Sequence, residues 1–309
     1  MRYLMYDQFS GNNSIVIVDG RTVKLFEEEE NCSIPQLPKA GSDRPVLFQH
    51  GKDVLLCGGL RYKKDCIKLD HSKKKWTNYN SLHIACLYST AVAIKDAVYV
   101  LGGDEGYGLP TANEMLKHDK TKWKEKKAVP FDLDGGCGVK ISDNEFVVIG
   151  GDSRSAPDYV RKIRKFNTIK NKWHNPGIQL HQGRYLHACA KFKNKIIIIG
   201  GQTEKDGHQL GSNSTEIIDI SEEGDLSIRL GQPMNIRRKR HAAHVVIWDN
   251  VPTLIVFGND YHPENIEDKG EVEVWNDYSE TWNTLSNMTW KSDQYVFSSA
   301  IIPKELICP

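Results

Sequence analysis

The sequence predicts an all-β fold assembled from repeated four-stranded sheets, and three observations predict it. Apolar runs of four or more residues end in a glycine pair whose first glycine lies at position 58, 102, 150 and 200, and a fifth copy ends in Gly258-Asn259. A tryptophan follows four of these glycines by 18 to 24 residues, at positions 76, 123, 173 and 282. Sustained helical periodicity is absent from the chain. Recurrence at this spacing is typical of repeat architectures, in which each copy is one structural unit.

Each part of the repeat has a physical interpretation. An apolar run such as Ile196 to Ile199 predicts a strand that is buried on both faces. The glycine pair is expected where no side chain fits or where φ is positive. The tryptophan is expected to fill the wedge between neighbouring sheets. An alternating strand such as 271–275 follows each run, and another strand such as 187–192 precedes it, so each repeat has four strands, which we label a to d.

This combination of buried strand, glycine pair and tryptophan resembles the kelch motif, over roughly residues 44–290. The fourth repeat departs from the motif because it lacks the tryptophan, so an aliphatic residue must take its place. The resemblance implies an all-β, six-bladed kelch β-propeller in a single domain. Five repeats are expected at approximately 44–81, 82–130, 131–180, 181–234 and 235–289.

A sixth blade is expected from the two ends of the chain. Five repeats alone would leave strand edges unpaired, and a closed ring removes these edges. We expect residues 1–43 plus 290–309 to form the closing blade. Its strands b, c and d are predicted at 2–6, 14–18 and 22–26, separated by short turns. Strand a is predicted at 295–302, from the C-terminus.

Composition excludes some classes of function. The formal net charge is +1, so the overall charge favours neither nucleic acid nor a membrane surface as a partner. No apolar run approaches the roughly 18 residues of a membrane helix, and residues 1–10 lack a signal-peptide pattern. We expect a cytoplasmic protein that is monomeric as an isolated domain.

The chain has seven cysteines, an odd number, and none is in CxxC spacing. Cys57 and Cys189 lie in apolar strand patterns, where a free cysteine acts as a small hydrophobe. We interpret the cysteines as reduced thiols of an intracellular protein. N-x-S/T triplets favour the alternative, secretion, and they begin at Asn12, Asn31, Asn213 and Asn287.

Function is expected in loops, because the blades are scaffold. The b–c loops and the segments that lead into strand a are expected on the same face. Arginines and aromatic residues, which are typical of interaction hot spots, occur in both sets. The candidate partner-binding residues are Arg61, Tyr62, Tyr107, Arg154, Tyr261 and His262 in the b–c loops, and Arg184, Tyr185, Arg237, Arg238 and Arg240 before strands a.

The basic run 237–241 has several interpretations. It fits a nuclear-import signal or a nucleic-acid patch, and also an ordinary solvated turn. By register, Arg238 matches Arg184 and His241 matches His187, which predicts that the run lies at the mouth of the central channel. There it would favour an acidic peptide ligand. The two histidines are expected to make hydrogen bonds within their own blades.

The resemblance implies a protein-interaction module. The chain is similar to the propeller of kelch-like adaptor proteins. In that family, separate BTB and BACK regions bind a cullin ubiquitin ligase, while the propeller holds the substrate. The 309 residues contain no such region, so this role rests on family analogy and on the chain being a fragment or a shortened relative. Actin binding is another role in the family.

An enzyme acting on a small molecule such as a sugar acid in the channel, as an isomerase or lyase, is the alternative. Motifs of nucleophilic, zinc-protease or P-loop chemistry are absent. Residues 102–108 are rich in glycine, but no helical pattern follows them, which argues against a dinucleotide site. We expect no catalytic residue, metal or cofactor.

Overall fold

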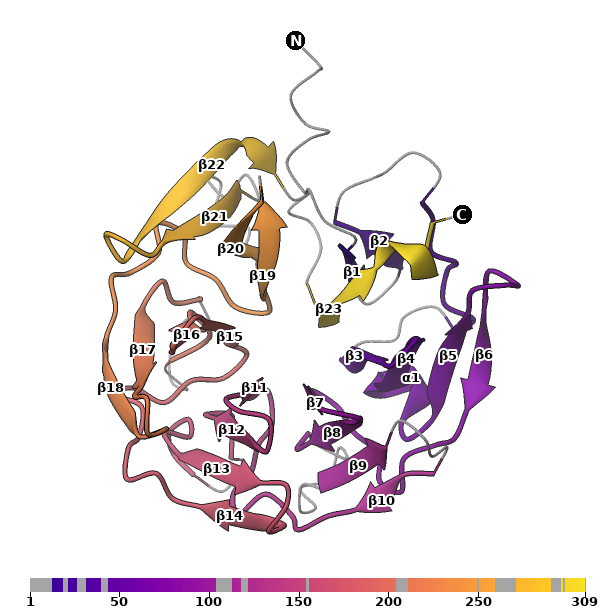
Figure 1. Ribbon diagram of the computed structural model, residues 1–309, viewed down its shortest axis with the longest axis horizontal. Coiled ribbons are helices and arrows are strands. Elements are labelled where there is room, and N and C mark those ends of the chain that lie inside the picture. Colours follow the sequence, from indigo (N-terminus) through magenta and orange to yellow (C-terminus); the bar gives the residue numbers. More distant parts are fainter. Residues whose placement is uncertain are drawn as a thin grey trace.

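The computed structural model describes residues 13–18, 22–26, 32–39, 44–103, 113–117, 122–153, 156–203, 211–248, 250–258, 271–289, 296 and 298–308. Their strands form antiparallel sheets that surround a central opening (Figure 1). Neighbouring innermost strands contact one another around the opening, and β23 near the C-terminus contacts both β19 and β3, which closes the ring. The chain is therefore an all-β propeller.

Five sheets have four strands each, in the order of the sequence from the centre outwards. The strands are β3 (Pro45–His50), β4 (Asp53–Gly58), β5 (Cys66–Asp70) and β6 (Lys75–Tyr79); β7 (Thr90–Ile94), β8 (Ala97–Leu101), β9 (Asn113–Lys117) and β10 (Lys124–Glu125); β11 (Cys137–Lys140), β12 (Glu145–Ile149), β13 (Ile163–Asn167) and β14 (Lys172–His174); β15 (Ala188–Phe192), β16 (Lys195–Ile199), β17 (Thr215–Ile220) and β18 (Leu226–Leu230); and β19 (Ala242–Trp248), β20 (Val251–Phe257), β21 (Glu271–Asn276) and β22 (Thr281–Thr289). A short helix, α1 (Gly59–Tyr62), follows β4.

The remaining sheet joins the two ends of the chain. It contains β2 (Val23–Leu25), β1 (Asn13–Val18) and β23 (Ser298–Pro303), and a 3₁₀ turn, η1 (Lys304–Leu306), follows β23. β1 pairs with β23 along its whole length, from Asn13 opposite Pro303 to Val18 opposite Ser298. The prediction that strands from both termini share one sheet is confirmed.

The predicted order of the N-terminal strands was wrong by one position. β1 lies next to the innermost strand, where strand b was expected at 2–6, which are outside the described residues. Burial explains the difference: Val16 packs into one core cluster and Ile17 into another, so β1 is buried on both faces. That is the property of strand b in every repeat.

The outer edge of this sheet is partly covered by the segment 32–37. The Gln36 side chain accepts from the Val23 backbone N–H at 3.2 Å and donates to the Val23 carbonyl at 3.0 Å. Ile34 and Leu37 from the same segment pack into the core beside β2. One amide side chain thus satisfies the two backbone groups that a neighbouring strand would satisfy.

The glycine pairs mark places where the chain leading into the next sheet crosses the end of strand b. The backbone N–H of Gly103 donates to the Leu133 carbonyl at 2.9 Å, and that of Gly151 donates to the Arg184 carbonyl at 2.8 Å. A Cβ on Gly102 would lie 2.3 Å from the Leu133 oxygen, so no larger residue fits. The motif therefore joins consecutive sheets through the backbone.

The tryptophans join consecutive sheets at the outer strand. The indole N–H groups of Trp76, Trp123 and Trp173 each donate to a backbone carbonyl of the segment leading into their own sheet, at 2.8 to 3.0 Å. In the fourth repeat, Ile228 of β18 lies opposite Ile218 and packs against the core. An aliphatic residue thus takes the place of the tryptophan, as predicted.

The interpretation of the cysteines as reduced thiols was wrong for six of the seven. Disulfides join Cys32 to Cys308, Cys57 to Cys66, and Cys137 to Cys189. Sequence spacing alone could not pair them, because one bond joins consecutive sheets and another spans 276 residues. None of the helices in the described residues has the length and apolarity needed to cross a membrane.

Candidate functional site

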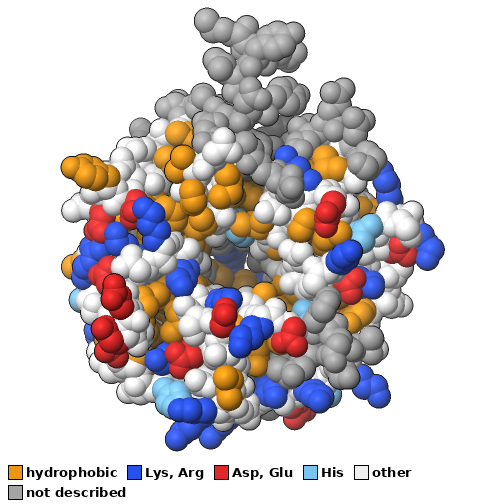
Figure 2. All heavy atoms as spheres, in the orientation of Figure 1, with side chains coloured by type: hydrophobic (Ala, Val, Ile, Leu, Met, Phe, Trp, Pro, Cys, Tyr) orange, Lys and Arg blue, Asp and Glu red, His pale blue; other side chains and the backbone are white. Residues whose placement is uncertain are grey.

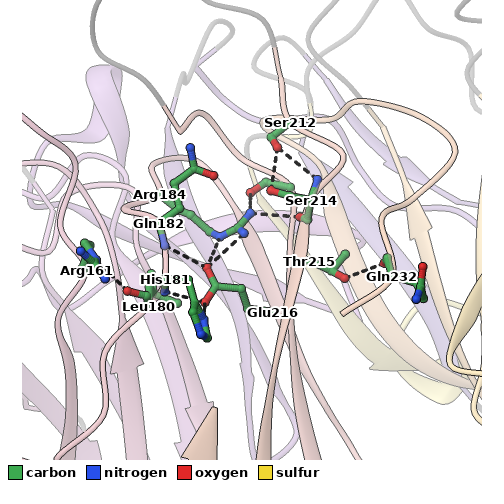
Figure 3. Close-up of polar contacts among 11 residues, drawn as sticks. Arg161, Leu180, His181, Gln182, Arg184, Ser212, Ser214, Thr215, Glu216 and Gln232 are labelled. Atoms are coloured by element: carbon green, nitrogen blue, oxygen red, sulfur yellow. Dashed lines mark hydrogen bonds and ion pairs between the residues drawn. The ribbon is translucent and has the colours of Figure 1, made fainter. Parts of the chain in front are cut away.

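Arg184 is a buried structural residue. Its side chain is 1% exposed, and its Nε and Nη2 both donate to Oε1 of Glu216, at 3.2 and 3.1 Å (Figure 3). Its Nη1 donates to the carbonyls of Gly200 and Ser214, at 2.9 and 3.0 Å. The second carboxylate oxygen of Glu216 accepts from the backbone N–H of His181. The guanidinium therefore fastens the segment before β15 to the ends of β16 and β17.

Arg238 repeats this arrangement in the next sheet. Its side chain is fully buried, its Nε donates to Oε2 of Glu273 at 3.0 Å, and its Nη1 donates to the Gly258 carbonyl at 3.0 Å. Arg184 and Arg238 thus bind equivalent groups, a glutamate and a glycine carbonyl, as their predicted register match implies. Both arginines were expected to face a ligand at the channel mouth. The structure accounts for both side chains without a ligand, because carbonyls and a carboxylate of their own sheets accept their N–H groups.

His187 and His241 lie between sheets. A Cβ on Gly150 of the preceding sheet would lie 2.7 Å from the His187 ring, and the same relationship joins Gly200 to His241. Burial, and then the neighbouring Arg184, lower the pKa of His187 to about 3. Burial, and then Arg238, hold the pKa of His241 well below its usual range. Both rings are therefore neutral and fill the space between sheets. The prediction had instead been hydrogen bonds within their own blades.

A ring of backbone hydrogen bonds surrounds the channel just before the innermost strands. Each N–H donates to the carbonyl of the corresponding residue one sheet earlier: Tyr88 to Arg44, Gly135 to Tyr88, Leu186 to Gly135, Arg240 to Leu186 and Val296 to Arg240, at 2.8 to 3.2 Å. The first five of these residues have φ between 50° and 66°. This left-handed conformation is uncommon for residues other than glycine, and its recurrence shows that the ring demands it.

Side chains at or next to this ring form what we call the mouth cluster: Arg44, Tyr88, Tyr185 and Arg240. The Arg44 guanidinium lies over the Tyr88 ring, 4.4 Å from its centroid. Arg240 Nη2 donates to the Tyr88 hydroxyl at 3.3 Å. The Tyr88 and Tyr185 rings meet edge to face at 5.8 Å. These half-buried side chains come from four sheets and gather around the central opening, where Figure 2 shows a hollow lined in part by basic side chains.

An acidic pair adjoins the mouth cluster. The backbone N–H of Asp152 donates to the Asp134 carbonyl at 2.8 Å, which brings the two carboxylates together. Burial, and then the charge of Asp152, raise the pKa of Asp134 to about 7, although Arg44 opposes the shift. Tyr159 stacks on Tyr185 with centroids 5.5 Å apart. The channel mouth thus combines two cations, several phenol rings and a carboxyl group that titrates near neutral pH.

The other predicted site residues lie apart from this cluster or outside the described residues. Arg61 and Arg237 are exposed. Tyr62 is 3% exposed, and its hydroxyl accepts from the backbone N–H of Lys39 at 3.3 Å, so it belongs to the core. Four more predicted residues are outside the described part of the chain: Tyr107, Arg154, Tyr261 and His262.

Sequence reasoning missed Arg44, Tyr88 and Asp134. The repeat register was a usable signal, because Arg44, Tyr88 and Arg240 occupy the same position before their innermost strands. The basic run 237–241 pointed to the channel mouth in the fifth repeat only, so the equivalent positions of the first two repeats were missed. In the described residues, no group of three or more histidine, cysteine, aspartate or glutamate side chains is arranged to hold a metal ion.

The chain is similar to several known proteins. No protein-family model matches the chain. Alpha-scruin of Limulus polyphemus is 23% identical over 201 residues, which cover 64% of this chain and 22% of that protein. Kelch domain-containing protein 10 of Xenopus laevis is 27% identical over 173 residues, which cover 52% of this chain and 40% of that protein. The solved structure of YjhT matches with a TM-score of 0.67 and 14% identity, covering 86% of this chain and 89% of that one.

These similarities differ in what they establish. The matched regions span less than half the length of the two curated relatives, and an identity of 14% to YjhT shows the fold alone. Together with the ring of sheets, these similarities support a kelch β-propeller.

Proposed function

We propose that this chain is a protein-interaction module, a closed six-bladed ring that binds a partner protein at its channel mouth. The observation that carries the proposal is the convergence of Arg44, Tyr88, Tyr185 and Arg240 from four sheets on the central opening. Arginine and tyrosine are the residue types that most often dominate binding energy at protein interfaces. The structural roles of Arg184 and Arg238 leave the mouth cluster as the main contact surface.

The chemistry of the cluster favours an acidic peptide segment of the partner. Guanidinium groups bind carboxylates through paired, charge-assisted hydrogen bonds. Arg44 lies over the Tyr88 ring and Arg240 donates to its hydroxyl, so an acidic side chain entering the mouth meets both cations. Exposed Arg61 and Arg237, which lie apart from the cluster, stay in the proposal as further contacts, as do Tyr107, Arg154, Tyr261 and His262 from the b–c loops.

The role as substrate receptor of a cullin ubiquitin ligase, acting in the cytoplasm, is a narrower form of the same proposal. It requires a ligase-binding region in addition to the residues of this chain, and it rests on the kelch resemblance. Actin is an alternative partner for the same surface. Cosedimentation with actin filaments distinguishes the ligase receptor from the actin-binding protein, because only actin binding predicts that the chain pellets with the filaments.

One observation favours an enzyme as a second candidate. A carboxyl group with a pKa near 7 is suited to general acid–base catalysis, and Asp134 has this property beside Arg44 and Tyr185. The candidate activity is isomerisation or elimination of a small sugar acid held by the arginines. Incubation with sugar acids in deuterium oxide tests it, because Asp134→Asn should abolish deuterium incorporation into the substrate.

Affinity capture with mass spectrometry tests the interaction module. The bait variants are the wild type, the double variant Arg44→Gln/Arg240→Gln, and Lys172→Gln, which removes an exposed charge from the outer strand β14. We expect the acidic partner to be recovered about tenfold less with the double variant and unchanged with Lys172→Gln. Equal recovery with all three baits would exclude the mouth cluster as the binding surface.

A further inference from the structure

The C-terminal residues seal the seam where the two ends of the chain meet. The backbone N–H of Ser33 donates to the Ile307 carbonyl at 3.2 Å, and His71 Nδ1 lies 2.8 Å from the Leu306 carbonyl oxygen. Leu306 and Ile307 are 8% and 5% exposed and pack in the same core cluster as β1 and β2. Residues 304–308 therefore hold the closing sheet against both the segment 32–37 and the first repeat.

A covalent bond lies at this seam. The disulfide between Cys32 and Cys308 joins the segment that leads into β3 to the end of the C-terminal segment, across 276 residues. Figure 1 shows η1, which precedes Cys308, beside β2. This crosslink encloses nearly the whole ring, and because it is covalent, Cys32 and Cys308 separate only when it is reduced.

The Cys57–Cys66 bond differs from the seam bond in both reach and access, and the Cys137–Cys189 bond differs from it in reach. Cys57 and Cys66 lie opposite each other on β4 and β5, nine residues apart, and are 0% and 1% exposed. Cys137–Cys189 joins the innermost strands of consecutive sheets across 52 residues. Cys32 and Cys308 are both half-buried, so a soluble thiol reaches them without opening a sheet. A crosslink constrains the unfolded chain more as its loop lengthens, so the seam bond has the largest expected effect on stability.

We propose that Cys32 and Cys308 are a thiol–disulfide lock on ring closure, whose redox state sets the stability of the whole propeller. Closing the lock consumes one disulfide of a small-molecule or protein oxidant. One cysteine thiolate attacks that disulfide and releases the first thiol, and the second cysteine displaces the other thiol from the mixed disulfide. The two cysteines lose two electrons and two protons in total, which appear in the two thiols released. A dithiol reverses the exchange.

Graded reduction of the full chain tests the lock. The oxidised protein is incubated over a range of dithiothreitol concentrations, alkylated, mapped by peptide mass spectrometry, and melted at each concentration. We expect Cys32 and Cys308 to be alkylated at lower dithiothreitol than Cys57 and Cys66. Their reduction should lower the Tm by about 5–10 °C.

Two double variants separate the lock from a general effect of reductant. Cys32→Ala/Cys308→Ala should have the Tm of the reduced wild type and should not respond to the lowest effective dithiothreitol concentrations. Cys137→Ala/Cys189→Ala keeps the seam bond and should still show the first drop in Tm. If the first variant does not fold, the graded reduction of the wild type measures the same shift.

Three results would overturn the proposal. One is alkylation of Cys32 and Cys308 without any reductant after treatment with oxidised glutathione. The second is reduction of Cys57–Cys66 before the seam bond. The third is complete reduction of the seam bond with an unchanged Tm.

Discussion

Arg184 and Glu216 form an ion pair that is buried at 1% and 0% side-chain exposure, with two guanidinium nitrogens on one carboxylate oxygen. Arg238 and Glu273 form the equivalent pair one sheet later. A buried pair is retained only when hydrogen bonds satisfy the remaining polar atoms, and backbone groups do so here. The pair fixes the path by which the chain leaves one sheet and begins the next, and it makes these arginines part of the scaffold.

Replacement of Arg184 by alanine should therefore destabilise the fold. The substitution leaves the Glu216 charge buried without its cation, and such losses cost about 3–5 kcal/mol. Urea denaturation measures the change in the free energy of unfolding. The exposed Arg237→Ala is the matched control and should change it by less than about 0.5 kcal/mol. A stable Arg184→Ala protein that fails only in partner capture would instead support the ligand-binding role expected from sequence.

The blades were predictable because their signals are local and repeated. The run from Ile196 to Ile199 is fully buried, as its uninterrupted apolar pattern requires. The glycine pairs and tryptophans also lie where predicted, since close backbone approach and wedge filling admit few other residues. The register match of Arg184 with Arg238 was correct, and only its functional interpretation changed.

The channel mouth and the seam were less predictable, because both depend on residues distant in sequence. Arg44 meets Tyr88 where consecutive sheets pack together, and Tyr88 meets Arg240, 152 residues away, only after the ring has closed. Cys32 and Cys308 are likewise brought together by the pairing of β1 with β23. No local sequence pattern predicts contacts between residues so far apart in the chain. Glu216 and Glu273 offered a partial signal, because a single acidic residue in a buried strand requires a cationic partner.

The tryptophan hydrogen bonds should contribute measurably to stability. Trp123→Phe loses the bond from Nε1 to the Asn80 carbonyl and leaves that carbonyl short of a donor. The Nε1 atom of Trp282 is buried and has no hydrogen-bond partner among the described residues. Both substitutions remove a similar apolar volume, so Trp123→Phe should cost about 1 kcal/mol more than Trp282→Phe. Chemical denaturation of the two variants checks this, and a larger loss for Trp282→Phe would contradict it.

Neutral histidines between sheets should make the fold sensitive to acid. Burial first, and then Arg184, lower the pKa of His187 to about 3, whereas the unfolded chain protonates near 6.5. Between these values the unfolded state binds the extra proton, so stability falls as the pH drops, by about 1.4 kcal/mol per pH unit for this residue. His187→Asn removes that contribution. Unfolding free energies measured from pH 7 to 4 should show a shallower slope for the variant, and parallel slopes would contradict the assignment.

Asp134 should have the opposite effect on the pH dependence. Its folded pKa of about 7 lies above its ordinary value of 3.8, because of burial and then the charge of Asp152. Between these values the folded state binds the extra proton, so the carboxyl group makes the protein less stable as the pH rises toward 7, and the loss persists above it. Asp134→Asn removes this cost. After discounting for partial exposure, we expect the variant to be more stable by about 1–3 kcal/mol at pH 8 and within about 0.5 kcal/mol of the wild type near pH 4. Urea denaturation at the two pH values tests the difference. A gain of equal size at both would mean that packing at the channel mouth, and not the charge of Asp134, sets its contribution to stability.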